Sequence, residues 1–437
     1  MIEKFLIGSS LLLSSLVASP GFSNILCKND LIELQASFAI KGRVHHPIII
    51  FENKILAIAE GYMNSAYLLD RTASMHSERI HVEPISESMR DLYASAFFDK
   101  DHFVIGAEQL SYFDSNGKNL KDIETARPIS AGPLMRHDGS VVVASGSQEG
   151  QIEFISPDGK VTKSIQLKYP ASWLGLQPNK SESILAQGRG YLYWLDPEGN
   201  ITKSFQAKAA SYAPRISEKG VIAWPTDSGV LYLFSPSGQP LAEFEAFEEV
   251  YIPDHGLIKK SESMSSRPAF LKNGMLVVVG GTKNGITGED ARPRGHVHFM
   301  NAYGEEKAPI TKIIGRSYVS PEVLEDGTIV NVAEEVYFFD SNGNLKEKFK
   351  RGTDSHYTRL AALSGSRVAV AEMTHSKAES TRDAKVIILN ASGQVLGEFH
   401  TAHDGISRIQ QIGNGTIAIA AWNKHSDDDT LFILKLK

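Results

Sequence analysis

Two acidic turns begin as a calcium-binding loop begins. Residues 114–117 and 340–343 both read Asp-Ser-Asn-Gly. A complete EF-hand loop also needs a glutamate at its twelfth position, which binds the ion with both oxygens. That position holds Thr125 after the first turn and Arg351 after the second. Both segments are therefore predicted to be hairpin turns, and no metal site is predicted.

The histidines could support chemistry, because imidazole binds zinc and copper and acts as a general base near neutral pH. Of the 14 histidines, nine fall in or next to segments that connect predicted strands. No two of them have the spacing of a metal site on a helix. A place in solvated loops is therefore preferred to a ligand role. These nine are His76, His81, His255, His296, His356, His375, His400, His403 and His425.

Nucleophilic catalysis and phosphate binding have no recognisable motif in this chain. It contains no Gly-x-Ser-x-Gly elbow, and the glycines of residues 280–288 do not stand between a strand and a helix. We predict no catalytic residue and no cofactor.

The elements that position these residues are copies of one β-sheet unit. Seven predicted hairpins end in a turn glycine, and successive glycines are 42, 40, 39, 66, 39 and 50 residues apart. Asp, Asn, Ser and Pro before the glycine supply the bends and the positive φ of a short hairpin. A period of about 40 residues is typical of four-stranded β-propeller blades. The glycines are Gly117, Gly159, Gly199, Gly238, Gly304, Gly343 and Gly393.

Each hairpin is preceded by a matching first half, as in residues 132–144 and 320–332. We name the four strands A to D, with A lining a central channel. Weaker copies at residues 46–70 and 409–434 flank the seven, and the last copy lacks a D strand. Residues 33–40 could supply it, which would leave no exposed edge. The pattern predicts an all-β, single β-propeller of nine blades closed by its terminal strands; eight blades is the alternative, because the terminal copies are irregular.

Aromatic, arginine and histidine residues lie near the predicted starts of A strands, around the channel mouth. Such side chains at a concave opening are typical of binding hot spots. They are also expected of side chains that plug a propeller tunnel, and both interpretations are kept. A small anionic or sugar-like ligand, or an acidic loop of another protein, would suit this set. The candidates are His46, Tyr93, Trp173, Tyr212, Arg267, Tyr318, Tyr357, Arg359 and Arg408.

The D-to-A and B-to-C connections of a propeller open on one face, here called the D–A/B–C face. The nine histidines above would share it. Four long connections lie there as well, at residues 245–267, 280–295, 374–385 and 423–429. Insertions on one face of a repeat scaffold are typical of its binding surface, although neutral variation in loop length is the alternative.

Composition bears on partners and location. The net charge of −6 argues against nucleic acid, whose binding depends on clustered Lys and Arg. Lys4 and the apolar run after it predict a secretory signal peptide at residues 1–23, followed by a propeller domain at residues 24–437. An uncleaved anchor is the alternative. Export to the periplasm or the extracellular space is therefore predicted, with no transmembrane segment after cleavage. The single cysteine, Cys27, can form no internal disulfide.

The repeat resembles the quinoprotein-type (PQQ-like) β-propeller repeat over roughly the whole mature chain. Pro133, Asp138, Gly139, Phe154, Asp158 and Gly159 fill the places of that repeat in one unit, and Pro321, Asp326, Gly327, Tyr337, Asp340 and Gly343 fill them in another. The tryptophan that usually ends the repeat is replaced by Ile165, Phe205, Phe244, Phe349 and Phe399. Quinone dehydrogenases of the family often use a vicinal cysteine pair, which one cysteine rules out. The resemblance implies the fold without the quinone, and a scaffold role like that of a relative, an outer-membrane-assembly lipoprotein.

These observations favour an exported, non-catalytic propeller that binds a protein or another cell-envelope component through the D–A/B–C face. One alternative is an envelope enzyme, such as a lyase, a lactonase or a quinone-dependent oxidoreductase, that uses the histidines of that face. Another is a carbohydrate-binding propeller that uses the mouth tyrosines and Trp173.

Overall fold

The structure of the protein is a computed structural model. It describes residues 27–437 apart from 29–30, 45–46, 52–53, 60–63, 71–79, 82–85, 89–93, 98–100, 179–181, 210–211, 253–255, 265, 282–293, 316, 318, 353–354, 376–381, 425 and 427. The predicted signal peptide and its cleavage site lie outside the described residues. Every regular element of the described part is a β-strand. None of its segments is a helix long and apolar enough to cross a membrane.

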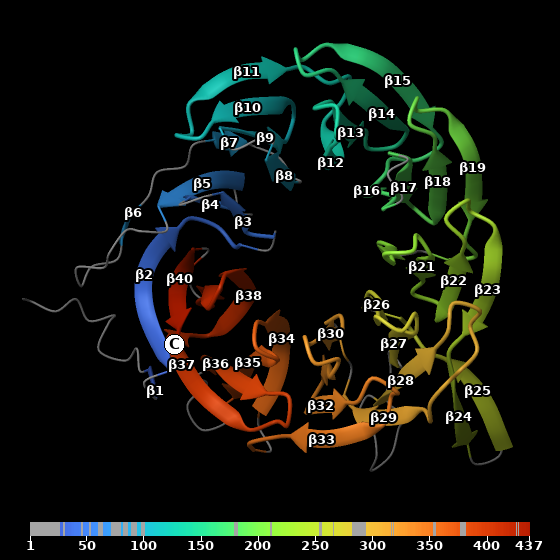
Figure 1. Cartoon of the computed structure of the whole chain (residues 1–437), viewed down its shortest axis with the longest axis vertical. Coiled ribbons are helices and arrows are strands. Elements are labelled where there is room, and N and C mark those ends of the chain that lie inside the picture. Colours follow the sequence, from blue (N-terminus) through green and yellow to red (C-terminus); the bar gives the residue numbers. More distant parts are fainter. Residues whose placement is uncertain are drawn as a thin grey trace, which may run out of the picture.

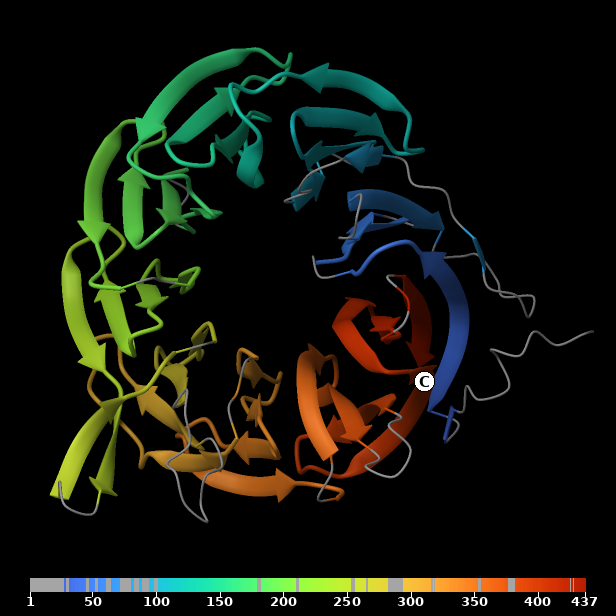
Figure 2. The same cartoon turned by 180° about the vertical axis from the view of Figure 1, so that it is seen from behind.

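Nine antiparallel sheets stand side by side in a closed ring, and they are numbered here as blades 1 to 9 (Figures 1 and 2). The predicted propeller and its nine blades are confirmed. Blades 1 to 3 are β3 (Ile49–Phe51), β4 (Lys54–Ala59), β5 (Asn64–Asp70) and β7 (Ser86–Ser88); β8 (Ala94–Phe97), β9 (His102–Gly106), β10 (Leu110–Asp114) and β11 (Asn119–Ile123); and β12 (Ile129–Met135), β13 (Val141–Ser145), β14 (Gly150–Ile155) and β15 (Val161–Leu167).

Blades 4 to 6 occupy the next part of the ring. They are β16 (Trp173–Leu176), β17 (Ile184–Gly188), β18 (Tyr191–Leu195) and β19 (Ile201–Gln206); β20 (Arg215–Ile216), β21 (Ile222–Pro225), β22 (Val230–Phe234) and β23 (Pro240–Glu245); and β26 (Ala269–Phe270), β27 (Leu276–Gly281), β28 (Arg294–Met300) and β29 (Thr311–Ile314). The long connection between blades 5 and 6 forms a separate hairpin of β24 (Phe247–Ile252) and β25 (Gly256–Ser261), which projects from the outer edge of the ring (Figure 1).

Blades 7 to 9 complete the ring. They are β30 (Glu322–Val323), β31 (Ile329–Val332), β32 (Val336–Phe339) and β33 (Leu345–Phe349); β34 (Ser355–Leu363), β35 (Arg367–His375), β36 (Arg382–Asn390) and β37 (Val395–His403), with β1 (Cys27–Lys28) at the edge; and β38 (Gly405–Gly413), β39 (Thr416–Trp422), β40 (Asp429–Leu436) and β2 (Ile32–Ile40), with β6 (Ile80–His81) beyond it.

The two ends of the chain close the ring in blade 9. Strand β40 pairs antiparallel with β2 along its whole length, from Ile32 opposite Leu436 to Ile40 opposite Asp429. The predicted role of residues 33–40 as the missing D strand is confirmed. Figure 1 shows β2 and β40 side by side next to the C-terminus. The edge that β40 would expose is therefore covered from within the same chain.

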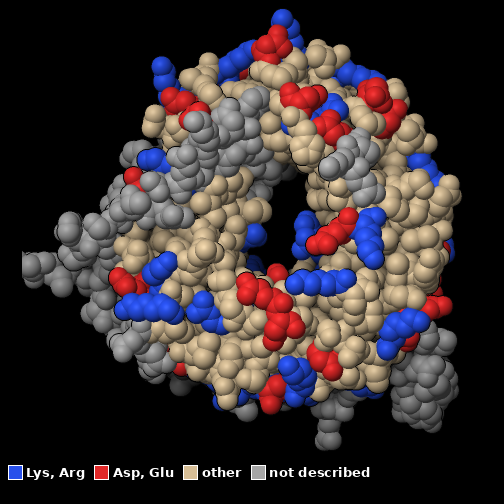
Figure 3. Space-filling view, viewed as in Figure 1, with Lys and Arg blue, Asp and Glu red and all other residues tan. Residues whose placement is uncertain are grey.

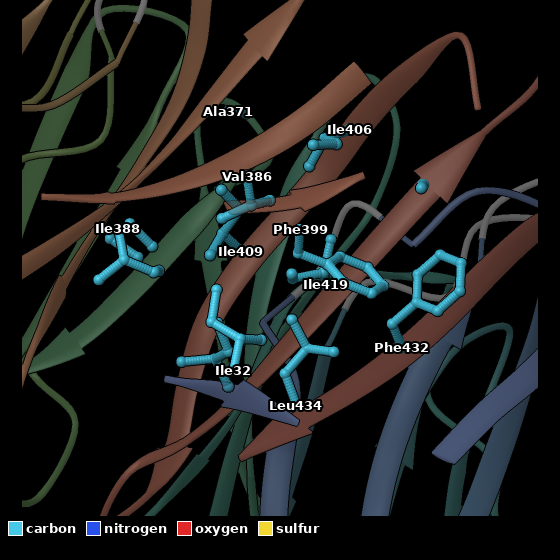
Figure 4. Packing of buried hydrophobic residues seen from close by; sticks show 14 of the residues in the cluster. Ile32, Ala371, Val386, Ile388, Phe399, Ile406, Ile409, Ile419, Phe432 and Leu434 are labelled. Carbon is cyan, nitrogen blue, oxygen red and sulfur yellow. The ribbon is translucent and has the colours of Figure 1, made fainter. Parts of the chain in front are cut away.

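The hydrophobic core consists of nine separate clusters, one for each pair of neighbouring blades. The cluster between blades 8 and 9 joins Phe399 of β37 to Ile419 and Phe432 of blade 9 (Figure 4). The cluster between blades 9 and 1 joins Phe38 of β2 to Tyr67 of β5. Since both faces of every blade are buried, the B and C strands are apolar at nearly every position.

The two Asp-Ser-Asn-Gly turns share one hydrogen-bond pattern. Asp114 Oδ1 accepts hydrogen bonds of 2.9 Å from the backbone N–H groups of Asn116 and Lys118. The bond from Lys118 holds the Asp114 pKa below its usual range. Asp340 makes the same pair of bonds, with Asn342 and Asn344. In both turns the carboxylate serves the backbone of its own hairpin.

The turn glycines also allow neighbouring blades to approach each other closely. Gly199 ends the C–D turn of blade 4 with a φ of 80°. A Cβ at this position would lie 2.7 Å from the ring of Phe154 in blade 3. Only glycine fits both the backbone conformation and this close approach. The C–D turn of blade 4 therefore packs directly on an aromatic ring of blade 3.

Candidate functional site

A cavity of about 840 Å³ lies in the central channel, on the side of blades 5 to 9. Figure 3 shows the opening at the centre of the ring, with Lys and Arg side chains on its wall. The cavity is formed by residues on or just ahead of five consecutive A strands and by Pro47 ahead of blade 1. Among the described residues, the side chains named next enclose this space. The residues that line it are Pro47, Tyr212, Ala213, Arg215, Ser266, Arg267, Val319, Ser320, Glu322, Arg359, Leu360, Ala361, Ala362, Ser407, Arg408, Ile409, Gln410 and Gln411.

Four arginines face this cavity from four different blades. Arg215 comes from β20, Arg267 from the segment before β26, Arg359 from β34 and Arg408 from β38. Glu322 of β30 is the one acidic residue among the described residues of the lining. The lining therefore has a formal charge of +3, four arginines minus one glutamate, in a protein whose net charge is −6.

The ring walls desolvate these charges, and the charges act on one another. Burial lowers the pKa of Arg267, and the nearby charges of Arg215 and Arg408 lower it further. Burial also lowers the pKa of Arg408, with Arg359 adding to the decrease and Glu322 opposing it. The Arg267 side chain is nevertheless exposed to the water of the channel, so that its desolvation is partial. Arg267, Arg359 and Arg408 remain charged at neutral pH, because even a lowered arginine pKa stays far above 7.

Glu322 is the internal counter-charge of the group. Burial raises the pKa of its carboxyl group, while the charges of Arg215 and Arg408 lower it. In the described lining, one carboxylate thus stands among four guanidinium groups.

Two side chains of the lining, Arg359 and Gln410, are held in position by hydrogen bonds to backbone groups. Arg359 donates from Nε to the Ser407 carbonyl oxygen at 2.7 Å and from Nη1 to the Thr358 carbonyl oxygen at 2.8 Å. The amide of Gln410 binds the backbone of Ile48, accepting from its N–H at 2.9 Å and donating to its C=O at 2.6 Å. These bonds tie blades 8, 9 and 1 together around the cavity. The site is thus largely formed before any ligand arrives.

Ser266 adds a polar group that has no hydrogen-bond partner among the residues that the structure describes. Its side chain is 4% exposed and lines the cavity, and its Oγ makes no hydrogen bond. A buried hydroxyl without a hydrogen bond is unfavourable, so it is an available donor or acceptor for a ligand. Next to it, the backbone N–H of Arg267 donates to Ser320 Oγ at 3.2 Å.

The structure brings together four of the nine predicted site residues. Tyr212, Arg267, Arg359 and Arg408 all line the cavity. His46, Tyr93 and Tyr318 lie outside the described residues. Trp173 and Tyr357 do not line the cavity.

Trp173 and Tyr357 pack between blades instead. Trp173 is half-buried against the cluster that joins blades 4 and 5. Tyr357 is buried in the cluster that joins blades 7 and 8, and its hydroxyl lies 3.4 Å from Glu372 Oε1. The reason is the alternation of side chains along a strand, which a register shift between Tyr357 and Arg359 modifies locally.

Sequence reasoning missed Arg215, Ser266 and Glu322. Arg215 is three residues after Tyr212, and Glu322 is two residues after Ser320 in the equivalent segment of blade 7. Arg215 and Glu322 are the first residues of β20 and β30, and Ser266 lies three residues ahead of β26, so their position at the beginning of an A strand was the available signal.

A second polar cluster lies between blades 5 and 6, away from the channel. Glu262 is fully buried and contacts Nδ1 of His296, while His298 Nδ1 lies 2.9 Å from Glu306 Oε1. Burial opposes the charge of Glu262, but hydrogen bonds from both histidines outweigh it and hold its pKa below the usual range. Within the described part of the chain, no three His, Cys, Asp or Glu side chains are arranged to hold a metal ion. This cluster joins the segment after β25 to strand β28.

Comparison with known proteins identifies the fold. No protein-family profile matches the sequence, and no curated protein sequence matches it. The structure is similar to the crystal structure of BamB from Moraxella catarrhalis, with a TM-score of 0.50 and 12% sequence identity. The similarity covers 79% of this chain and 100% of that one. At this identity the likeness supports the propeller architecture and leaves the function to the site itself.

Proposed function

We propose that the protein is an exported, non-catalytic β-propeller that binds a protein or another component of the cell envelope through its D–A/B–C face. The arginine-lined cavity is the centre of that contact. The observation that carries the proposal is the convergence of Arg215, Arg267, Arg359 and Arg408 on one cavity with Glu322 as the only described carboxylate. Arginine at a concave, partly desolvated opening is the usual hot-spot residue of a binding surface.

The carbohydrate-binding alternative has less support than the anionic one. Sugar recognition depends on aromatic faces, and Tyr212 is the one predicted aromatic that lines the described cavity. Trp173 and Tyr357 contribute to the contacts between blades. A cationic lining favours a partner with negative charge.

The test is capture of envelope proteins on the immobilised mature chain, compared between two double variants. In the first, Arg267→Gln and Arg408→Gln remove two charges of the cavity. In the second, Lys219→Gln and Lys272→Gln remove two exposed lysines at the A–B turns of blades 5 and 6, at the opposite end of the channel. We expect the same partner to be retained by wild type and by the lysine variant, and to be lost from the arginine variant. Equal capture by all three proteins would contradict the proposal.

Export is tested separately by cell fractionation. We expect a chain whose mature N-terminus follows Ser23 in the envelope or the medium, and a chain that lacks residues 1–23 to stay in the cytoplasm. An unprocessed chain of full length in the membrane fraction would support the anchor alternative instead.

A further inference from the structure

We infer that a cluster of two histidines and two glutamates between blades 5 and 6 is a pH-sensitive latch, which holds the base of the β24–β25 hairpin on blade 6 and loosens as the pH rises. The cluster consists of Glu262, His296, His298 and Glu306. The inference goes beyond the proposed function and does not depend on it, because the latch needs no partner protein.

The latch lies where the hairpin rejoins the ring. Glu262 follows directly on β25, and its backbone N–H donates to the Ala246 carbonyl oxygen at 3.0 Å, across the base of the hairpin. The next residue, Ser263, exchanges backbone hydrogen bonds of 2.9 and 3.0 Å with Gly281 at the end of β27. The backbone bonds that tie the hairpin base to blade 6 therefore stand directly beside Glu262. A change in the environment of its side chain acts on these bonds.

Glu262 contacts both histidines of β28. Its side chain is fully buried, its Oε1 contacts His296 Nδ1, and its Oε2 lies 3.9 Å from His298 Nε2. The His298 side chain is also buried, and its Nδ1 lies 2.9 Å from Oε1 of Glu306 on the other side. Glu306 is exposed. The His298 ring therefore stands between two carboxylates, one in the interior and one at the surface.

The contact between Glu262 and His298 depends on charge alone. Neither Glu262 Oε2 nor His298 Nε2 has a hydrogen-bond partner among the described residues, and 3.9 Å is too long for a hydrogen bond between them. Gly280 of β27 encloses the carboxylate, since a Cβ there would collide with Oε2. A charged imidazolium attracts the carboxylate. A neutral ring that donates Nδ1–H to Glu306 turns the lone pair of Nε2 toward it, so that loss of one proton replaces attraction by repulsion.

The surroundings of His298 add no further charge to this exchange. The ring of Phe244, at the end of β23, packs edge-on against it with ring centroids 5.3 Å apart. Lys312 of β29 is opposite His296 in the strand register, and it is exposed to solvent. The charges that act on the His298 ring are those of Glu262 and Glu306, and His296 is its third titratable neighbour, with ring centroids 6.1 Å apart.

The pKa shifts agree with the geometry and give the direction of the switch. Burial opposes the charge of His298, but the two carboxylates outweigh it and raise its pKa above the ordinary value of 6.5. Burial also opposes the charge of Glu262, but the two histidines outweigh it and hold its pKa below the ordinary value of 4.5. A raised histidine pKa stabilises fully below 6.5, and a lowered glutamate pKa stabilises fully above 4.5. The latch is therefore strongest between these two values and weakens as the pH rises through the pKa of His298.

The test is amide hydrogen exchange of the full chain from about pH 5.5 to about pH 9, measured by mass spectrometry and corrected for the intrinsic exchange rate at each pH. A peptide that contains Glu262, Ser263 and Met264 reports on the hairpin base, and a peptide from β35 in blade 8 is the reference. We expect protection of the hairpin base to fall at least fivefold over this range, with the reference unchanged. Constant protection at the hairpin base, or an equal fall in β35, would overturn the inference.

Four variants assign the effect. In Glu262→Gln, which keeps the shape and removes the buried charge, protection should change less than about twofold over the pH range. His298→Gln should give low protection at every pH. Glu306→Gln should keep the fall and move its midpoint to lower pH, because one of the two carboxylates that stabilise the charged ring is lost. His137→Gln, at an exposed A–B turn of blade 3, is the control and should behave as wild type. A wild-type pH profile in Glu262→Gln or in His298→Gln would contradict the assignment.

Titration of the His298 ring by NMR needs no change in the core. In protein labelled at histidine, the surface variant Glu306→Gln identifies the His298 signal, because its pKa should fall most. We expect the wild-type ring to titrate above 6.5, with the midpoint at which the hairpin base loses protection. A ring that titrates below 6.5, or midpoints that differ by more than about one pH unit, would show that His298 does not control the hairpin.

Discussion

The arginines of the cavity place positive charge where it opposes the stability of the protein. The ring partly desolvates the guanidinium groups of Arg267, Arg359 and Arg408, and charges of the same sign act on Arg267 and Arg408. Folding by itself would favour neutral side chains at such positions. Replacing one of these arginines therefore measures what its charge costs in stability.

Replacing Arg267 by glutamine should stabilise the free protein. The change removes one charge that faces Arg215 and Arg408, and the expected gain is about 0.5 kcal/mol in the free energy of unfolding, because the side chain keeps contact with channel water. The measurement is denaturant unfolding at low and high salt, with the gain shrinking at high salt. Lys219→Gln, an exposed lysine at the other end of blade 5, is the matched control with no expected change. A less stable Arg267→Gln protein would show that the arginine has a structural partner.

Asp429 is a further residue whose burial opposes its charge. It belongs to blade 9 and contacts Ser407, which lines the cavity. Its Oδ2 accepts hydrogen bonds from Val44 N at 2.9 Å and from Ser407 Oγ at 2.7 Å. Burial nevertheless raises the pKa of its carboxyl group to about 6. Between the ordinary aspartate pKa near 4 and this value, the folded protein binds more protons than the unfolded chain.

The free energy of unfolding should therefore fall as the pH rises from about 4 to about 6, by up to about 3 kcal/mol. Asp429→Asn should remove this decrease, because the amide keeps an acceptor for Val44 and Ser407 and carries no charge. Denaturant unfolding of both proteins at pH 4.5 and pH 7 measures the difference. The same pH dependence in the two proteins would assign the effect to other groups.

At the scale of the elements, the C–D turn fixes the distance between neighbouring blades. In blade 7 the turn glycine, Gly343, has a φ of 87° and lies against Phe299 of blade 6. The A–B turn of the same blade also ends in a glycine, Gly327, with a φ of 86°. A Cβ would lie 2.6 Å from Phe299 Cγ at Gly343, whereas at Gly327 the nearest atom is 3.7 Å away, on Ser341.

The two glycines form a matched pair for measuring the contact between blades. Gly327→Ala should lower the free energy of unfolding by about 1 kcal/mol, because alanine is unfavourable in the left-handed conformation. Gly343→Ala should lower the free energy of unfolding by about 2 kcal/mol more, because the added methyl group overpacks the contact with Phe299. The midpoints of denaturant unfolding measure both changes. Equal destabilisation would mean that the turn does not set the spacing of the blades.

At the scale of the whole molecule, the architecture could be predicted from sequence and the site only in part. The turn motif around Gly159 repeats with little change, so the blade count and the pairing of residues 33–40 with the last strand follow from periodicity and the need to cover an edge. Whether a residue lines the cavity depends on the direction in which its side chain points from a short A strand. Strand β20 has two residues, and β34 has a register shift between Tyr357 and Arg359, so periodicity alone could not separate Arg359 from Tyr357 or find Arg215 and Glu322.

Ring closure makes blade 9 different from every other blade, because its D strand, β2, comes from the opposite end of the chain. In blade 8 the D strand β37 follows its neighbour β36 through a short turn, so losing side-chain contacts leaves the two strands tethered. In blade 9 only hydrogen bonds and packing hold β2 on β40. Phe38 of β2 and Phe399 of β37 are both almost fully buried, which makes them equivalent probes of the two situations.

Phe38→Ala and Phe399→Ala should each lower the free energy of unfolding by about 3–5 kcal/mol, the usual cost of a deleted core phenylalanine. Their local effects should differ. In Phe38→Ala, hydrogen exchange measured by mass spectrometry should accelerate in β2 and β40 well below the denaturant concentration of global unfolding, because untethered strands separate locally. In Phe399→Ala, exchange in β36 and β37 should accelerate only together with the rest of the protein. If both variants lose protection uniformly, the ring opens cooperatively and the junction of the two chain ends is no weaker than any other contact between strands.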